Sequence, residues 1–317
     1  MPNASTTIDL WPELDWPKWR ETAVALQLRT QIVGKVRLAL TPWLNHSWHV
    51  PLYVSARGLT TSPIHCGTHI LEIAFDFLAD ALILTTSDGA ERRIPLEPGS
   101  IADFHGKVMA ALAELDIAVT IDGLPSEMPD PVRFADDHAH RPYDADAVRG
   151  FWRALIQATR VFEQFRTGFL GKASPTHFFW GSFDLASTRF SGRSAPPHPG
   201  GVPGLPDAVT RDAYSEQEAS LGFWPGSDAF PQAAFYAYAY PAPAGYAEAK
   251  VEPAAAVYDT TLGEFLLPYE AVRSAPDPDA ALLAFCHTSY DAAADLGAWD
   301  RDALECPIGR PKVVRAV

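Results

Sequence analysis

The sequence has few cysteines and no long apolar run, and both absences limit what the protein can be. Its three cysteines, Cys66, Cys286 and Cys306, are an odd number at wide spacing. They therefore fit neither a disulfide framework nor a zinc-binding pattern. No stretch approaches the roughly 20 apolar residues that a membrane-spanning helix needs. No basic start followed by an apolar run precedes Trp19, so we expect a cytoplasmic protein without a signal peptide or a membrane partner.

Positive charge and glycine-rich motifs are also scarce. Lys and Arg number 25 against 39 Asp and Glu, a net charge of −14, and such a surface repels a phosphate backbone, so we expect no nucleic-acid partner. The segment Gly168–Lys172 lacks the spacing of a phosphate-binding loop, and Gly181-Ser182 lacks the second glycine of a nucleophile elbow. No motif indicates a cofactor. The sequence names no substrate and leaves open whether the protein is an enzyme.

Apolar and aromatic residues, by contrast, are plentiful. Hydrophobic residues make up 47% of the 317, including nine Trp, ten Tyr and seventeen Phe. A chain of this composition folds into an ordered globular body, in one large domain or two.

A similar pattern of residues occurs twice along the chain, and it predicts an internal repeat. In each copy a Trp-Arg pair is followed by Gly-Lys, then by a tryptophan, then nine positions later by an arginine. The first copy is Trp19-Arg20, Gly34-Lys35, Trp48 and Arg57, and the second is Trp152-Arg153, Gly171-Lys172, Trp180 and Arg189. Two copies suggest a pseudo-symmetric body with a pocket at the seam.

Hydrophobic periodicity then predicts the elements and the fold class. Helices are expected to about Leu28 and over 101–115, 144–168 and 277–296, and strands over 36–40, 48–57, 69–77, 82–86, 117–121, 177–189, 235–240 and 264–273. Hairpin-like spacing favours antiparallel pairing. We therefore predict an α+β fold of two tandem pseudo-symmetric repeats, 11–124 and 144–303, joined by a connector at 125–143 in one compact body. The Pro- and Gly-rich segment 190–232 is predicted as a long loop and a candidate lid.

The candidate site follows from aligning the two copies. If the repeated strands face each other, His49, Arg57, His177 and Arg189 line one cavity, and the arginines suit a small anionic metabolite. Trp48, Trp180 and Tyr238 are candidate walls of this cavity. Asp184 and Glu72 are the candidate bases if the protein catalyses a reaction. The alternative is structural, with each arginine stacked on an indole and bonded to backbone carbonyls.

Two other functions stay open. Asn45–His49 holds two histidines three residues apart. Together with His177 and Glu72 they form a candidate metal site, and the protein would then be a metal-dependent enzyme. This requires His46 to lie in a turn, and no metal ligand is assigned from the pattern. A non-catalytic protein that binds a partner through its aromatic residues is the other alternative.

Two segments resemble a known family. They are Asn45–Val54 (NHSWHVPLYV), followed by Ala56-Arg57-Gly58-Leu59, and Ser174–Ala186 (SPTHFFWGSFDLA). Both are similar to a bacterial family catalogued only as a domain of unknown function. The resemblance extends from Trp11 to about Trp299 and implies a single-family protein. It brings no established activity, and no catalytic residue is carried over from it.

Overall fold

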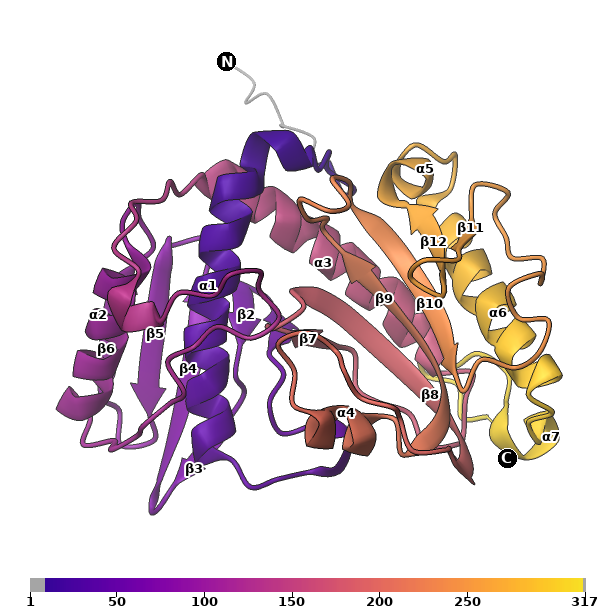
Figure 1. The fold of residues 1–317 in the computed structure, drawn as a ribbon, viewed down its shortest axis with the longest axis horizontal. Helices are drawn as coiled ribbons and strands as arrows, with labels where there is room; N and C mark the ends of the chain where they lie inside the picture. Colours follow the sequence, from indigo (N-terminus) through magenta and orange to yellow (C-terminus); the bar gives the residue numbers. More distant parts are fainter. Residues whose placement is uncertain (1–8, 316–317) are drawn as a thin grey trace.

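Two antiparallel six-stranded sheets form the framework of residues 9–315, which the computed structural model describes (Figure 1). In the first half of the chain the elements are α1 (Trp16–Leu40), η1 (Asn45–Ser47), β1 (Tyr53–Ser55), β2 (Gly58–Thr60), β3 (Ile64–Cys66), β4 (His69–Asp76), β5 (Ala81–Thr86), β6 (Glu91–Pro95) and α2 (Ile101–Glu114). After η2 (Phe134–Asp136) the second half holds α3 (Ala145–Arg166), β7 (His177–Phe179), β8 (Asp184–Ser194), α4 (Asp207–Ala213), β9 (Glu216–Trp224), β10 (Ala234–Tyr240), β11 (Val257–Asp259), β12 (Glu264–Pro268), α5 (Tyr269–Arg273), α6 (Pro278–Leu296) and α7 (Arg301–Leu304).

The predicted α+β class and antiparallel pairing are confirmed. The first sheet has the order β1-β2-β4-β5-β6, with β3 also paired to β4, and the second has the order β11-β12-β10-β9-β8-β7. Each half begins with a long helix and holds six strands, but α4 interrupts the strands of the second half and the strand orders differ. Among residues 9–315, no helix is both long and apolar enough to cross a membrane.

The edges of the two sheets meet at one pair of residues. Leu52 and Phe178 form an antiparallel bridge, in which each amide donates to the other's carbonyl oxygen at 2.9 and 2.8 Å. Both side chains are fully buried. An exposed sheet edge has unpaired backbone groups that pair readily with another strand. This bridge pairs backbone groups on both edges at once and holds the two halves together.

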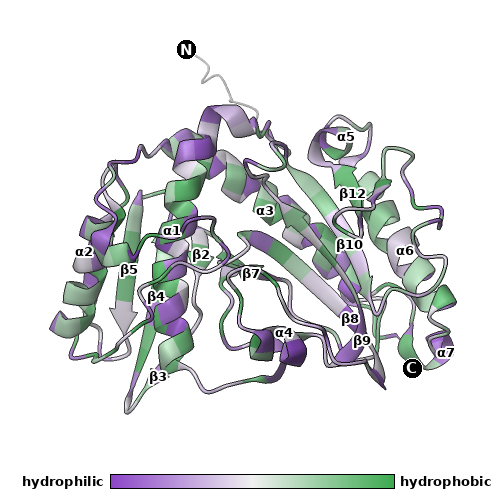
Figure 2. Ribbon diagram, in the orientation of Figure 1, coloured by the Kyte–Doolittle hydropathy of each residue, from purple (hydrophilic) through white to green (hydrophobic). Residues whose placement is uncertain are grey.

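The second sheet has one apolar face and one polar face. Leu185, Phe223, Phe235 and Leu267 are successive cross-strand partners, so their side chains share a face. All four are buried, and Phe235 contacts Phe162 of α3 with the ring centroids 6.3 Å apart. In Figure 2 hydrophobic residues dominate β4 and β5, whereas the short α4 is mostly hydrophilic. The apolar face of the second sheet thus packs into the core against α3, whereas its other face is polar.

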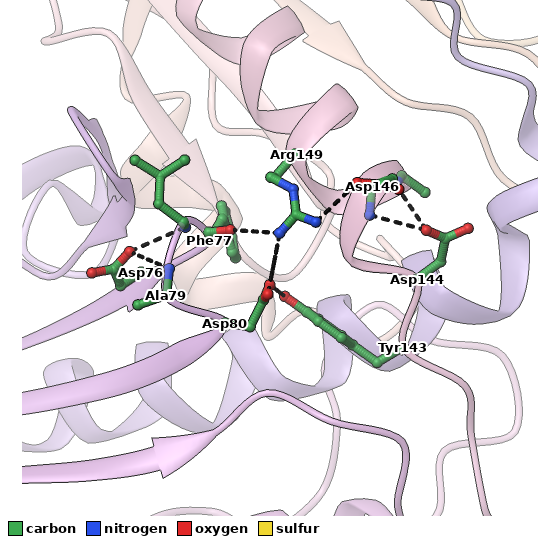
Figure 3. Close-up of polar contacts among 10 residues, drawn as sticks. Asp76, Phe77, Ala79, Asp80, Tyr143, Asp144, Asp146 and Arg149 are labelled. Carbon is green, nitrogen blue, oxygen red and sulfur yellow. Dashed lines mark hydrogen bonds and ion pairs between the residues drawn. The ribbon is translucent and has the colours of Figure 1, made fainter.

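Helix α3 is tied to the first sheet by a partly exposed ion pair. Asp144 caps the helix by accepting from the amides of Asp146 and Ala147. One turn later, Arg149 donates to Asp80 in the β4–β5 turn at 3.1 Å, and the hydroxyl of Tyr143 donates to the same carboxylate (Figure 3). The first turn of α3 is thus held to the opposite half.

Several elements differ from the predictions. Residues 36–40 are the end of α1, not a strand, and 117–121 is irregular. The 264–273 segment is a strand only to Pro268, after which α5 begins. The segment 190–232 is not one long loop, because it contains the end of β8, helix α4 and strand β9.

The repeated strand also takes a different form. In the first copy it is reduced to Tyr53–Ser55, and in the second a turn at 180–183 separates β7 from β8.

Candidate functional site

A cavity of about 520 Å³ lies between the two halves, on the polar face of the second sheet. Its floor is formed by β7, β8, β9 and β10. Its walls come from the C-terminal part of α1, the 43–50 segment, the 122–131 segment and the segment 204–214 that includes α4. Pockets of roughly 300–1,000 Å³ are typical of small-molecule sites.

The polar floor is set by strand register. Ala186 pairs with Gly222, which pairs with Tyr236, while Thr188 pairs with Ser220, which pairs with Tyr238. Gly222 is required here because a Cβ atom would lie 2.3 Å from the Tyr236 hydroxyl oxygen. The tyrosine therefore lies across β9, and its hydroxyl reaches Asp184 on β8.

Asp184 is a hydrogen-bond acceptor on the cavity floor. Its two carboxylate oxygens accept hydrogen bonds from the hydroxyls of Ser182 and Tyr236. Burial raises the pKa of Asp184, against the two hydroxyl donors that lower it. Tyr238 stacks on Tyr236 with ring planes 13° apart and accepts a hydrogen bond from Tyr214 at 3.1 Å. The result is a polar and aromatic surface that lines the cavity.

A second carboxyl reaches the cavity from the connector. The backbone of Glu127 has a φ of 54°, and its carboxyl packs so closely on Gly181 that a Cβ there would lie 2.2 Å from Oε1. Burial, and repulsion by Asp184, raise the pKa of Glu127 to about 7. A carboxyl that titrates near neutral pH is suited to general acid–base chemistry.

A third carboxyl, Glu218, lies at the far end of the floor. Only 5% of this residue is exposed, and burial raises the pKa of its carboxyl well above the ordinary value, although Lys172 opposes the shift. Lys172 itself is engaged elsewhere: its ammonium lies 2.5 Å from Glu216 and 2.6 Å from Nε2 of His46. His46 also bonds the carbonyl oxygen of Ala213 at 2.8 Å through Nδ1, so it links η1 to the end of α4.

His177 is the most deeply buried histidine of the cavity wall. Burial, together with Arg166 and Arg37, lowers its pKa to about 3, so the ring is neutral at physiological pH. Within the described part of the chain its Nδ1 has no hydrogen-bond partner. That nitrogen is itself buried, so it is an unsatisfied polar atom of the cavity wall and not an exposed contact for a bound molecule.

The structure brings together five of the nine predicted site residues. Trp48, His177, Trp180, Asp184 and Tyr238 all line the cavity. The two tryptophans of the repeated pattern therefore face one space. The indole of Trp180 is fixed there by donating to the carbonyl oxygen of Val50 at 2.9 Å.

The other four predicted residues lie outside the cavity, so the expected convergence of two histidines and two arginines does not occur. His49 accepts from the amide of Leu44 at 3.2 Å through Nδ1, and its ring packs on that of Trp43 with the two planes tilted by 48°. Glu72 accepts from Thr60 at 2.6 Å on the first sheet.

The two arginines also have other partners. Arg57 pairs with Asp76 at 2.6 Å on the first sheet. Arg189 is on the opposite face of β8, where it donates to the carbonyl oxygen of Phe165 and packs on three aromatic rings. Strand parity explains this, because Arg189 is odd-numbered on β8 whereas the cavity face carries Asp184, Ala186 and Thr188.

The metal alternative gains no support from the geometry. Residues 9–315 contain no group of three or more His, Cys, Asp or Glu side chains placed to hold a metal ion. His46 does lie in a 3-10 turn, as that alternative required, but it bonds Ala213 and Lys172, whereas His49 points to Leu44.

Sequence reasoning missed several cavity residues, notably Glu127, Glu218 and Tyr214. Glu127 was hidden in a segment predicted as a connector, and Tyr214 and Glu218 in the segment predicted as a loop. The alternation Glu216, Glu218, Ser220, Gly222 is the one signal that predicts a strand with a polar face there.

Fold and site together define an α+β protein with a polar and aromatic cavity between two antiparallel sheets. The chain belongs to a family of unknown function, DUF5996, whose model matches residues 11–306. This confirms the resemblance noted in the sequence. Comparisons with the curated proteins and with the solved structures find no significant match.

Proposed function

We propose that this protein binds a small molecule in the cavity between its two halves. The observation that carries the proposal is the polar face of the second sheet that lines the cavity, where Asp184 and Glu218 are buried and Tyr236 and Tyr238 are half-buried. Burying polar groups costs free energy unless they gain partners. Such a surface is expected where a ligand has to be recognised.

The ligand is not expected to be an anion held by arginines. That prediction depended on Arg57 and Arg189, which bond to Asp76 and to Phe165 outside the cavity. If the protein is an enzyme, Glu127 and Asp184 are the candidate acid–base pair. Of the two bases that the sequence suggested, Asp184 lines the cavity and Glu72 does not.

Two finer predictions are kept as part of this proposal. The internal repeat is supported by a long helix followed by six antiparallel strands in each half, although α4 interrupts the second set, and by the edge bridge at Leu52 and Phe178. The cytoplasmic location is supported by the acidic composition and the scarcity of cysteine.

A ligand screen with a cavity-blocking variant tests the proposal. Thermal unfolding is followed with amines, polyols, carboxylates and phosphates, because a ligand at 100 times its Kd stabilises the folded state by about 2.7 kcal/mol. Val209→Trp places an indole on the cavity side of α4, and Val257→Trp makes the same change at an exposed position on β11.

We expect at least one chemical class to raise the Tm of the wild type and of Val257→Trp but not that of a folded Val209→Trp. A screen in which no class raises the Tm favours the alternative of a non-catalytic, partner-binding protein. A ligand whose effect is the same in both variants places its site elsewhere and contradicts the proposal.

A further inference from the structure

The charges around the cavity are strongly unbalanced toward acids. Four carboxyl side chains line it, from Asp122, Glu127, Asp184 and Glu218, against the single ammonium of Lys35. Lys35 is already engaged, since its Nζ lies 3.2 Å from the Ser126 hydroxyl and 3.7 Å from Asp122. Glu127 and Asp184 therefore have no cation of their own, and Lys172, the cation near Glu218, is held by Glu216 and His46.

Two of these acids have no hydrogen-bonding partner. Within residues 9–315, no donor reaches the carboxyl of Glu127. The charged group that acts on it is Asp184, which repels its negative charge and raises its pKa. Glu218 likewise accepts no hydrogen bond within the described residues. The charge of Lys172 lowers its pKa and that of Glu216 raises it. An ionised carboxylate in such a place is costly unless a cation pairs with it. A cationic ligand supplies that partner.

The aromatic walls suit the same ligand class. The chain's own ammonium groups already lie over cavity rings: Nζ of Lys172 is 5.6 Å from the Trp48 centroid, and Nζ of Lys35 is 5.8 Å from the Trp180 centroid. Indole faces attract cations through the ring quadrupole, and pockets of aromatic rings with carboxylates recognise ammonium ligands.

The acids lie at two separate ends of the floor. Asp184 and Glu127 are near the β7–β8 turn, next to the pair Ala186 and Gly222. Glu218 lies four residues further along β9, which is about 13 Å at the usual rise of a strand. The side chains of Tyr236 and Tyr238 cover the distance between the two ends.

We propose that the cavity binds an organic amine, with one ammonium group at the Glu127–Asp184 end and, in a linear diamine or polyamine, the second at Glu218. This inference rests on the proposed function and specifies its ligand class. Carboxylates at both ends and aromatic rings between them match a molecule with charged termini and an apolar middle.

The test is isothermal titration at about pH 8, where Glu127, whose pKa is about 7, is mostly ionised. The probes are α,ω-diamines of increasing chain length, n-alkylamines as matched monoamines, and α,ω-dicarboxylates as charge-reversed controls. The variants are Glu127→Gln, Glu218→Gln and, as the control, Glu91→Gln, whose carboxyl is at the surface beside Arg93. Folding of each is checked by thermal unfolding without ligand.

We expect diamines to bind the wild type more tightly than monoamines of equal length. Glu127→Gln is expected to weaken both by about tenfold or more, since charge-assisted hydrogen bonds are about twice as strong as neutral ones. Glu218→Gln is expected to weaken only the diamines, and Glu91→Gln neither.

Three results would overturn the inference. Dicarboxylates that bind while amines do not would refute the amine class and leave the proposed function standing. Amine affinity unchanged in Glu127→Gln would place the amine elsewhere. If no probe binds and the wider screen is also negative, the proposed function fails together with the inference.

Discussion

Replacing Glu127 by glutamine keeps the shape of the side chain but removes a group whose protonation is linked to folding. Glu127 is half-buried and lines the cavity together with Asp184, Lys35 and Asp122. Burial and Asp184 raise its pKa from the ordinary 4.5 to about 7. The folded chain thus keeps a proton that the unfolded chain loses at lower pH.

The sign and size of the effect follow from linkage. Between pH 4.5 and about 7 the folded state binds more protons than the unfolded state, so wild-type stability falls as pH rises. One pKa unit corresponds to 1.36 kcal/mol, and the whole shift therefore amounts to roughly 3 kcal/mol. The stabilisation is complete below pH 4.5 and lost above about 7.

Urea unfolding across this pH range measures the effect. We expect the free energy of unfolding of Glu127→Gln, relative to wild type, to rise by up to about 3 kcal/mol between acidic and mildly alkaline pH. Glu91→Gln, at an exposed position, is expected to follow the wild-type curve. A difference between Glu127→Gln and wild type that does not change with pH would refute the account of a buried, protonated carboxyl.

Three further outcomes follow from the contacts. Gly222→Ala is expected to cost about 1–3 kcal/mol in urea unfolding, because the new methyl meets the Tyr236 ring; an unchanged midpoint would contradict the close packing. Arg189→Ala is expected to lower the free energy of unfolding by more than about 3 kcal/mol, since it empties a buried aromatic site. Arg57 is more exposed, so Arg57→Ala is expected to cost about 1 kcal/mol or less. Equal losses in the two variants would be inconsistent with these environments. His177, with its pKa near 3, is expected to show no imidazole titration by NMR from pH 5 to 8, and a midpoint near 6.5 would indicate an exposed ring.

Elements with one clear periodic face were predictable from the sequence. Helix α2 follows the spacing of Phe104, Val108 and Leu112, with Ser100 as its cap, and β4 follows the alternation from Leu71 to Phe77. In both, burial on one side alone preserves the period in the sequence.

Helix α1 shows why other elements were not predictable. It is buried on most sides, with polar residues such as Arg29 and Lys35 among its inward positions, so its last turn showed no helical period. Short-range alternation in Val36, Leu38 and Leu40 then resembled a strand. Tertiary burial had overridden the local pattern.

The site was predictable only in part for a related reason. Trp48 and Trp180 were found through the repeated pattern, and both line the cavity. The arginines of the same pattern do not, because a turn at 180–183 and the start of β8 set the face that Arg189 takes. Glu127 reaches the cavity through tertiary packing on Gly181, which no local spacing encodes.

A crystal structure of the protein with the tightest-binding amine of the titration series tests the central claim most directly. The account predicts the molecule on the floor formed by β8, β9 and β10, with an ammonium nitrogen within hydrogen-bonding distance of Glu127 or Asp184. An amine bound outside the cavity, or a floor closed over by its own side chains, would contradict it.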